Sequence, residues 1–386
     1  MPETLTLQLI NHTTTSDAWA YITGLALRSS NRRIILDSTG QPYYPANPPR
    51  ILQPIPVDCA IPLGPPGNIT TLTLPQIAGG RIWFSVHKKL TFLLNPGGPG
   101  GGAALVEPSV LNPSDPNASV DFSFCEFTLN DAQLFANISY VDFVPRLPIS
   151  LTLQRMSGEV QHVSGMAPDG LERVAEGLRA QTRRDGKPWD KLVVVSKEDG
   201  RPLRALAPTH GGAVGASFEG YFEPLVEKAW ESRETGSLLR INTQAGPGVV
   251  GGKVEGDQMV IGGEKFSRPT TADILGCNSG PFTTGPSPTR NAIIPRLAAA
   301  FQRGCICDVE EHPSHPETFY KCESTNHYCR IVHECNLDGK GYAFAYDDVQ
   351  PDGGEDQSGK VNAGDPKVFI VAVGGAGAYV GDRLPY

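Results

Sequence analysis

The spacing of apolar and polar positions divides this 386-residue chain into two kinds of sequence. Residues 1–155 consist of short apolar runs separated by Pro, Gly and Asn turns, which is typical of a β-sandwich or β-barrel. The apolar runs predict strands over residues 5–10, 20–27, 33–36, 80–85, 89–94, 121–129, 138–144 and 149–153.

A helical period begins after residue 155. Leu171, Val174, Ala175 and Leu178 lie on one face of a predicted helix over residues 171–184. Further helices are predicted over 221–233 and 291–303, a buried strand over 191–197, and β-like segments over 238–243, 248–260, 341–349 and 368–373. We therefore expect a mainly β fold with an α/β part. A β-domain of residues 1–155, to which residues 336–386 return, is interrupted by a mixed α/β domain of residues 156–335.

Composition narrows the class of protein. The 43 glycines and 34 prolines favour a turn-rich β architecture over a helical one. A formal net charge of -8 and a pI near 5.5 argue against a nucleic-acid surface, which would be basic, but are compatible with a neutral polysaccharide partner. No apolar run approaches the ~20 residues that span a bilayer, so no membrane association is expected.

Eight cysteines, five of them between residues 305 and 335, predict a disulfide framework in an oxidising compartment. Eight cysteines allow about 105 pairings, so the sequence leaves the connectivity open. A zinc site is the alternative, from Cys305 and Cys307 with His312 and His315 nearby. Their spacing does not match the usual Cys-x2-4-Cys pairs, and we expect neither a metal nor another cofactor.

Four Asn-x-Ser/Thr sequons, at Asn11, Asn68, Asn117 and Asn137, support secretion, although each alone is a weak signal. The first residues, Met-Pro-Glu-Thr, lack the basic start and apolar core of a signal peptide. We therefore expect a mature extracellular chain with an added Met1.

Two carboxylates near the middle of the β-domain are the leading candidates for chemistry. Glu126 lies within Phe-Ser-Phe-Cys-Glu-Phe, an aromatic setting that we expect to be poorly solvated and to favour the protonated acid. Asp142 follows on the next predicted strand, and with a turn near Leu134 the two acids would project from one hairpin. A pair of acids in different surroundings suits hydrolysis of a glycosidic bond. Most acids are simply solvated, and that reading would prevail for either residue alone.

Several motifs, taken together, carry a resemblance to known families. The chain resembles the thaumatin-like proteins and, more closely, glycoside hydrolase family 64, the laminaripentaose-producing β-1,3-glucanases. The matching motifs are residues 104–109 (ALVEPS), 112–117 (NPSDPN), 126–130 (EFTLN), 138–142 (ISYVD), 147–149 (LPI), 271–282 (TADILGCNSGPF) and 341–349 (GYAFAYDDV).

This resemblance implies a wide groove between a thaumatin-like β-barrel or sandwich domain and the α/β domain, and an inverting mechanism. Glu126 matches the general acid of the family and Asp142 its general base. Thr128 and Asn130 match positions that bind substrate hydroxyls, and Phe135 matches a position whose aromatic ring stacks on glucose. Ser139, in the same motif, joins the substrate-binding candidates.

The remaining candidates have structural alternatives of comparable weight. Glu107 could face the groove or orient its loop. Thr271, Asp273 and Asn278 form a polar cluster suited to sugar hydroxyls, but a capped loop is an equal reading. Asp347 could line the groove, although a turn cap is the stronger interpretation.

Two functions remain in competition. The first is a secreted, monomeric, cofactor-independent endo-β-1,3-glucanase that inverts the anomeric centre and releases short oligosaccharides from laminarin- or curdlan-like glucan. The second is a non-catalytic thaumatin-like β-glucan-binding protein. Both need an acidic groove, but only the enzyme needs two acids in proton-transfer geometry.

Overall fold

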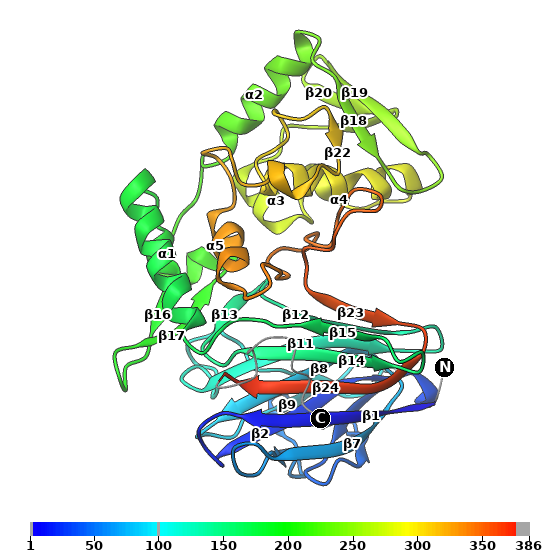
Figure 1. The fold of residues 1–386 in the computed structure, drawn as a ribbon, viewed down its shortest axis with the longest axis vertical. Helices are drawn as coiled ribbons and strands as arrows, with labels where there is room; N and C mark the ends of the chain where they lie inside the picture. Colours follow the sequence, from blue (N-terminus) through cyan, green and yellow to red (C-terminus); the bar gives the residue numbers. More distant parts are fainter. Residues whose placement is uncertain (1–2, 99–100, 376–386) are drawn as a thin grey trace.

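A two-sheet β-sandwich forms one half of the computed structural model, which describes residues 3–98 and 101–375 (Figure 1). The smaller sheet has five strands, in the order β15 (Val160–Val163), β14 (Ile149–Arg155), β24 (Pro366–Gly374), β1 (Thr4–His12) and β7 (Ile69–Pro75). The larger sheet has eight: β23 (Lys360–Ala363), β12 (Leu134–Ile138), β11 (Asp121–Leu129), β8 (Ile77–Val86), β2 (Ala18–Ala26), β3 (Arg32–Leu36), β4 (Pro42–Tyr43) and β6 (Ile61–Pro62), which pairs with β2.

Period-two alternation builds the core between these sheets. Leu5, Leu7 and Leu9 of β1 are buried and belong to the same apolar cluster as Ile82 and Phe127 of the larger sheet. Burial of alternate residues leaves the other face of each strand for a different role. On the larger sheet, that other face carries the candidate site.

The two ends of the described chain meet in the sandwich, because β1 pairs in parallel with β24 along Thr6–His12. Within the predicted C-terminal return of residues 336–386, the strands β23 and β24 lie in the sandwich sheets. Residues 376–386 lie outside the described part. The predicted domain boundary at residue 155 is too early. Strand β15 pairs with β14, so the sandwich continues to Val163.

Smaller sheets extend the two halves of the molecule. The strands β10 (Ala104–Val106), β9 (Leu93–Asn95) and β5 (Gln53–Pro54) form one sheet, and β13 (Phe143–Pro145), β17 (Pro202–Leu206) and β16 (Val193–Val195) form another. The upper part in Figure 1 contains a third, of β21 (Glu264–Phe266), β20 (Gln258–Ile261), β19 (Val249–Glu255), β18 (Leu239–Asn242) and β22 (Glu311–His312).

Helices lie almost entirely between residues 170 and 335. The α-helices are α1 (Gly170–Asp185), α2 (Glu223–Glu234), α3 (Thr271–Gly276), α4 (Pro288–Gln302) and α5 (His327–Cys335). The 3₁₀ helices are η1 (Leu27–Ser29), η2 (Trp189–Leu192), η3 (Pro208–Val214), η4 (Gly280–Phe282) and η5 (Pro316–Thr318). Among the described residues, none of these helices is long and apolar enough to cross a bilayer.

The helices predicted from the apolar pattern agree with the structure better than several of the predicted strands do. The predicted helices over 171–184, 221–233 and 291–303 are confirmed as α1, α2 and α4. The strand predicted over 138–144 is wrong, because β12 ends at Ile138 and the chain leaves the sheet there. Residues 341–349 form turns rather than a strand, and the predicted strand over 191–197 is shortened to β16, where Val195 is exposed.

The cysteines do not form the predicted disulfide framework, since all eight are free thiols. Six of them are buried, and Cys307 and Cys322 are partly exposed. Cys125 faces the sandwich core, whereas Cys59 packs in an aromatic cluster on the other side of the larger sheet. Residues 3–98 and 101–375 contain no group of three or more His, Cys, Asp or Glu arranged to hold a metal ion.

Most of the sequons are inaccessible. Asn11, Asn117 and Asn137 are 0%, 1% and 6% exposed, so a glycan cannot be attached to them in the folded protein. Asn68 is the one exposed sequon asparagine.

Candidate functional site

A row of polar residues crosses the outer face of the larger sheet. Strand register places Thr23, Arg81, Glu126, Asn137 and Lys360 opposite one another on β2, β8, β11, β12 and β23. Directly opposed residues in an antiparallel pair point to the same face, so these side chains form one line. The strand register shifts just beyond this row, between Phe127 and Leu129 on β11 and between Thr23 and Leu25 on β2. Such β-bulges change the direction in which nearby side chains point.

Arg81 is the centre of this row. Its Nε and Nη2 lie 3.1 and 3.0 Å from Oε1 of Glu126, and its Nη1 lies 2.6 Å from Oε2 of Glu107. Glu107 also accepts a 3.3 Å hydrogen bond from the Thr23 hydroxyl. One guanidinium therefore holds two carboxylates, and its planar fork fixes the orientation of both.

Aromatic rings lie beneath the guanidinium of Arg81. Its Cζ is 4.8 Å from the ring centroid of Phe124 and 5.4 Å from that of Trp83, within the range of cation–π contact. The Trp83 indole N–H donates to Thr23 at 3.1 Å, which ties the ring to the same row. This platform restricts the Arg81 side chain.

The prediction that Glu126 lies in apolar, poorly solvated surroundings is wrong. Cys125 and Phe127 point to the opposite face, into the sandwich core, because side chains alternate along β11. The Glu126 side chain is 37% exposed, and its nearest charged neighbour is a cation.

Asp142 is held by different partners. It lies beyond the end of β12, four residues past Ile138, and not on the hairpin strand that pairs with β11. His210 Nε2 on η3 is 2.9 Å from its Oδ1. The backbone agrees with this placement, since Phe143 pairs with Leu206 and the Ala207 N–H donates to the Asp142 carbonyl at 2.9 Å.

These neighbours favour the ionised form of Asp142. The hydrogen bond from His210 lowers the pKa of the carboxyl group; partial burial opposes this, and the charges of His210 and Arg81 reinforce it. Asp142 is thus suited to accept a proton rather than to donate one.

A turn-rich segment from residue 341 lies beside this region. The Tyr140 N–H donates to the Tyr342 carbonyl at 2.8 Å, and Ser139 bridges to Tyr342. Burial raises the pKa of the Tyr342 hydroxyl, and the charges of Asp348, Asp347 and Glu126 act in the same direction. Residues 341–349 thus approach the acid pair although they form no strand.

The predicted substrate-binding residues of the sandwich lie near Glu126 in the sheet. Thr128 and Phe135 are directly opposed on β11 and β12, on the same face as Glu126, and both are partly exposed. Asn130 lies in the turn between these strands, where its Oδ1 accepts the backbone N–H groups of Ala132 and Gln133 at 2.9 and 3.0 Å. Ser139 is 8% exposed at the Tyr342 bridge.

Of the predicted polar cluster, Thr271 and Asp273 lie on α3 and Asn278 lies just after it. The Thr271 hydroxyl donates to Glu223 at 2.5 Å and accepts the Phe222 N–H at 2.8 Å, and the residue is 3% exposed. Asp273 forms a capping box with Thr270, while Asn278 is exposed just past the helix. Thr271 and Asp273 therefore act within the fold, which corrects their assignment to substrate. A cavity of about 680 Å³ does open beside them, lined by Thr209, Phe218 and Thr271 among others.

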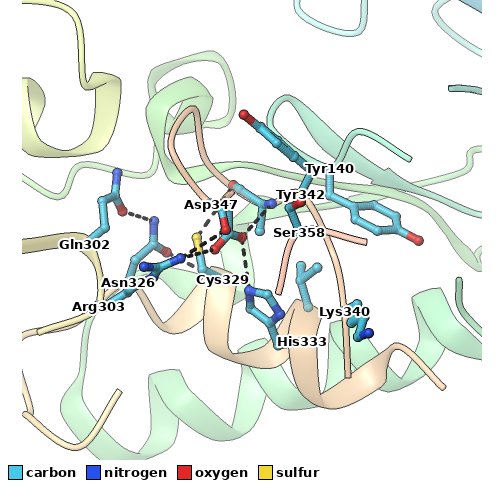
Figure 2. Close-up of polar contacts among 12 residues, drawn as sticks. Tyr140, Gln302, Arg303, Asn326, Cys329, His333, Lys340, Tyr342, Asp347 and Ser358 are labelled. Atoms are coloured by element: carbon cyan, nitrogen blue, oxygen red, sulfur yellow. Dashed lines mark hydrogen bonds and ion pairs between the residues drawn. The ribbon is translucent and has the colours of Figure 1, made fainter. Parts of the chain in front are cut away.

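The assignment of Asp347 to substrate binding is also wrong, because its side chain is fully buried. Figure 2 shows it facing Arg303 and His333, whose nitrogens lie 3.2 and 3.0 Å from its carboxylate. The Ala343 N–H donates to it at 3.0 Å. Burial acts to lower the pKa of His333, but the Asp347 carboxylate outweighs this and raises it. Asp347 thus pins the turn-rich segment to α4 and α5 and does not face substrate.

Sequence reasoning missed Arg81 and His210. An arginine within the otherwise apolar run Arg-Ile-Trp-Phe-Ser-Val was a usable signal, because a charged residue in a central strand needs a partner. His210 had none, since 68 residues separate it from Asp142.

Acid–base glycoside hydrolases place a pair of carboxylates at the scissile bond, and Glu126 and Asp142 are the candidate pair on this mainly β scaffold. Comparison with known proteins agrees. A sequence model of glycoside hydrolase family 64, described as beta-1,3-glucanase, matches residues 3–373. The chain belongs to glycoside hydrolase family 64.

Individual relatives give the same picture. A glucan endo-1,3-beta-glucosidase of Cellulosimicrobium cellulans is 31% identical over 295 residues, which are 72% of this chain and 50% of the relative. The chain thus spans about half the length of the curated relatives it matches. A crystal structure of a laminaripentaose-producing beta-1,3-glucanase in complex with laminaritetraose is 30% identical, with a TM-score of 0.83 over 97% of this chain and 99% of the other. A beta-1,3-glucanase domain from Clostridium beijerinckii shares the fold, with a TM-score of 0.74 at 22% identity over 96% and 98%.

Proposed function

We propose that this protein is an inverting endo-type β-1,3-glucanase in which Glu126 is the general acid and Asp142 the general base. The observation that carries the proposal is the separate support of the two acids. Glu126 is bound by Arg81 on the sheet, whereas Asp142 is bound by His210 from η3. Acids in different environments can take different proton-transfer roles.

In this mechanism Asp142 removes a proton from a water molecule, whose oxygen attacks the anomeric carbon. Glu126 gives its proton to the departing glycosidic oxygen as the carbon–oxygen bond breaks. Both residues then exchange protons with solvent, which restores the starting state. Because Glu107 shares Arg81 with Glu126, protonation of Glu126 leaves the guanidinium paired.

The substrate class follows from the relatives. We propose laminarin- or curdlan-like β-1,3-glucan, with short oligosaccharides of the laminaripentaose type as products, since a 30% identical structure bears that description. Thr128 and Phe135 would contact glucose units along the sheet. The groove would run between the sandwich, which we propose is thaumatin-like, and the α/β part.

We further propose that the enzyme acts outside the cell as a monomer without a cofactor. The substrate class supports this location, because cell-wall and storage glucans of this kind are too large to be taken up intact. Fractionation of the producing cells, with activity in the medium as the expected result, tests it.

The catalytic assignment is tested by E126Q and D142N, assayed separately for reducing ends released from laminarin. Each variant should lose at least about 100-fold in kcat while still binding the glucan in a pull-down. Wild-type release by both variants would overturn the assignment. If wild-type protein binds glucan but releases nothing, the protein is a glucan-binding module instead.

A further inference from the structure

We infer that His210 is a positioning residue that orients the carboxylate of Asp142 for proton abstraction from water. This inference rests on the proposed function. It adds a role for a residue that neither the sequence motifs nor the acid pair themselves assign.

The hydrogen-bond chemistry defines the direction of the contact. An ionised carboxylate only accepts hydrogen bonds, so the 2.9 Å contact requires a proton on His210 Nε2. His210 therefore donates to Oδ1, and Oδ2 is left to take the proton from the attacking water. A carboxylate with one oxygen anchored cannot rotate freely, which keeps the accepting oxygen in place.

The fold holds His210 rigidly in this position. Strand pairing of Phe143 with Leu206 brings β17 beside the residue after Asp142. The Ala207 N–H then binds the Asp142 carbonyl at 2.9 Å, and the His210 N–H binds the Ala207 carbonyl at 2.9 Å. Two backbone hydrogen bonds, both through Ala207, thus connect His210 to Asp142, whose carboxylate the imidazole contacts.

A glycine next to His210 makes the tight turn possible. The Ala216 N–H returns to the Gly211 carbonyl at 2.9 Å, and a Cβ on Gly211 would lie 2.5 Å from the Ala216 carbonyl oxygen. The residue before His210, Thr209, donates its hydroxyl to the Leu275 carbonyl at 3.3 Å, which connects η3 to α3. The local sequence Thr-His-Gly-Gly therefore serves to present the imidazole.

Among the described residues, His210 from η3 and Arg81 from β8 act on the charge of Asp142, and this charge in turn acts on Tyr328 of α5. Tyr328 donates its hydroxyl to the Tyr140 carbonyl at 2.7 Å and is uncharged, since burial raises its pKa well above the usual value. Removal of His210 takes away the hydrogen bond to the carboxylate and leaves Arg81 as the remaining favourable charge. The carboxylate would then be protonated at a higher pH.

The experiment measures kcat and KM of H210F and H210Q on laminarin across pH. H210F removes the donor, so kcat should fall about tenfold or more while KM stays near wild type, and the acidic limb of kcat/KM should move up by about one pH unit. H210Q retains an N–H donor at a similar reach, and should keep the wild-type limb and most of kcat. H315L, which removes an exposed histidine, is the matched control.

The outcomes separate this inference from the proposed function. If D142N is inactive but H210F keeps wild-type kcat and the wild-type acidic limb, the role of His210 is overturned and Asp142 remains the base. A fall in kcat for H210F and H210Q alike with an unshifted limb shows a structural role only, which also overturns it. If D142N is active, the base assignment itself fails. Circular dichroism checks folding, and H210L replaces H210F if that variant unfolds.

Discussion

Arg81 on β8 lies directly opposite Glu126 on β11, and two of its guanidinium nitrogens reach the same carboxylate oxygen at 3.0 and 3.1 Å. The third nitrogen of the fork binds Glu107. Strand register sets this contact and Trp83 and Phe124 support it from below, so the acid is oriented before any substrate arrives.

Substitution of Arg81 by Met should lower kcat on laminarin by about 10- to 100-fold, because charge-assisted hydrogen bonds of this kind contribute about 1.5–3 kcal/mol. R81K keeps the charge but not the planar fork, and should fall between R81M and wild type. Steady-state kinetics measures both, with thermal unfolding as the check on folding. Wild-type kcat in R81M would show that the orientation of Glu126 does not depend on this contact.

The acidic limb of activity should lie at unusually low pH. Asp142 must be ionised to act as base, and His210 lowers the pKa of its carboxyl group, so the active form persists as the pH falls. Activity should therefore be lost only below the ordinary Asp value of about 3.9. The kcat/KM profile on a soluble laminarin tests this, with circular dichroism at each pH to exclude unfolding. Loss of activity already near pH 5 in a folded protein would contradict the prediction.

The stereochemistry of the first product should be inverted. Direct attack by water on a β-linked glucan yields the α-anomer, because a single displacement changes the configuration once. Proton NMR during the first minutes of hydrolysis, before mutarotation, gives the ratio of the anomers. An initial excess of the β-anomer would instead indicate a covalent intermediate and a nucleophilic role for one of the acids.

Loss of the Asp347 charge should destabilise the protein strongly. D347N leaves the buried Arg303 without its ion-pair partner, which costs about 3–5 kcal/mol for pairs of this type. E198Q, which breaks the exposed pair with Lys88, is the matched control and should cost about 1 kcal/mol or less. Urea unfolding measures both variants. Equal midpoints would mean that the buried cluster adds no more than a surface pair.

The sequence by itself determined much of the local structure. The period of 3.6 located α1, α2 and α4, and an apolar run between turns located β11 over Asp121–Leu129 with Glu126 within it. Motif resemblance identified the family and singled out Glu126 and Asp142 as candidate acids. These features depend on residues close together in the chain, where backbone geometry turns a pattern directly into a face.

Only the tertiary structure decided what surrounds the acids. Arg81 and Glu126 are 45 residues apart, and His210 and Asp142 are 68 apart, so no local period joins them. The same applies to Asp347, for which the motif left both a groove-facing and a turn-capping role open and which the packing of α4 and α5 buries. A carboxylate's role depends on which charges and donors reach it through space, and strand register and the docking of η3 supply them.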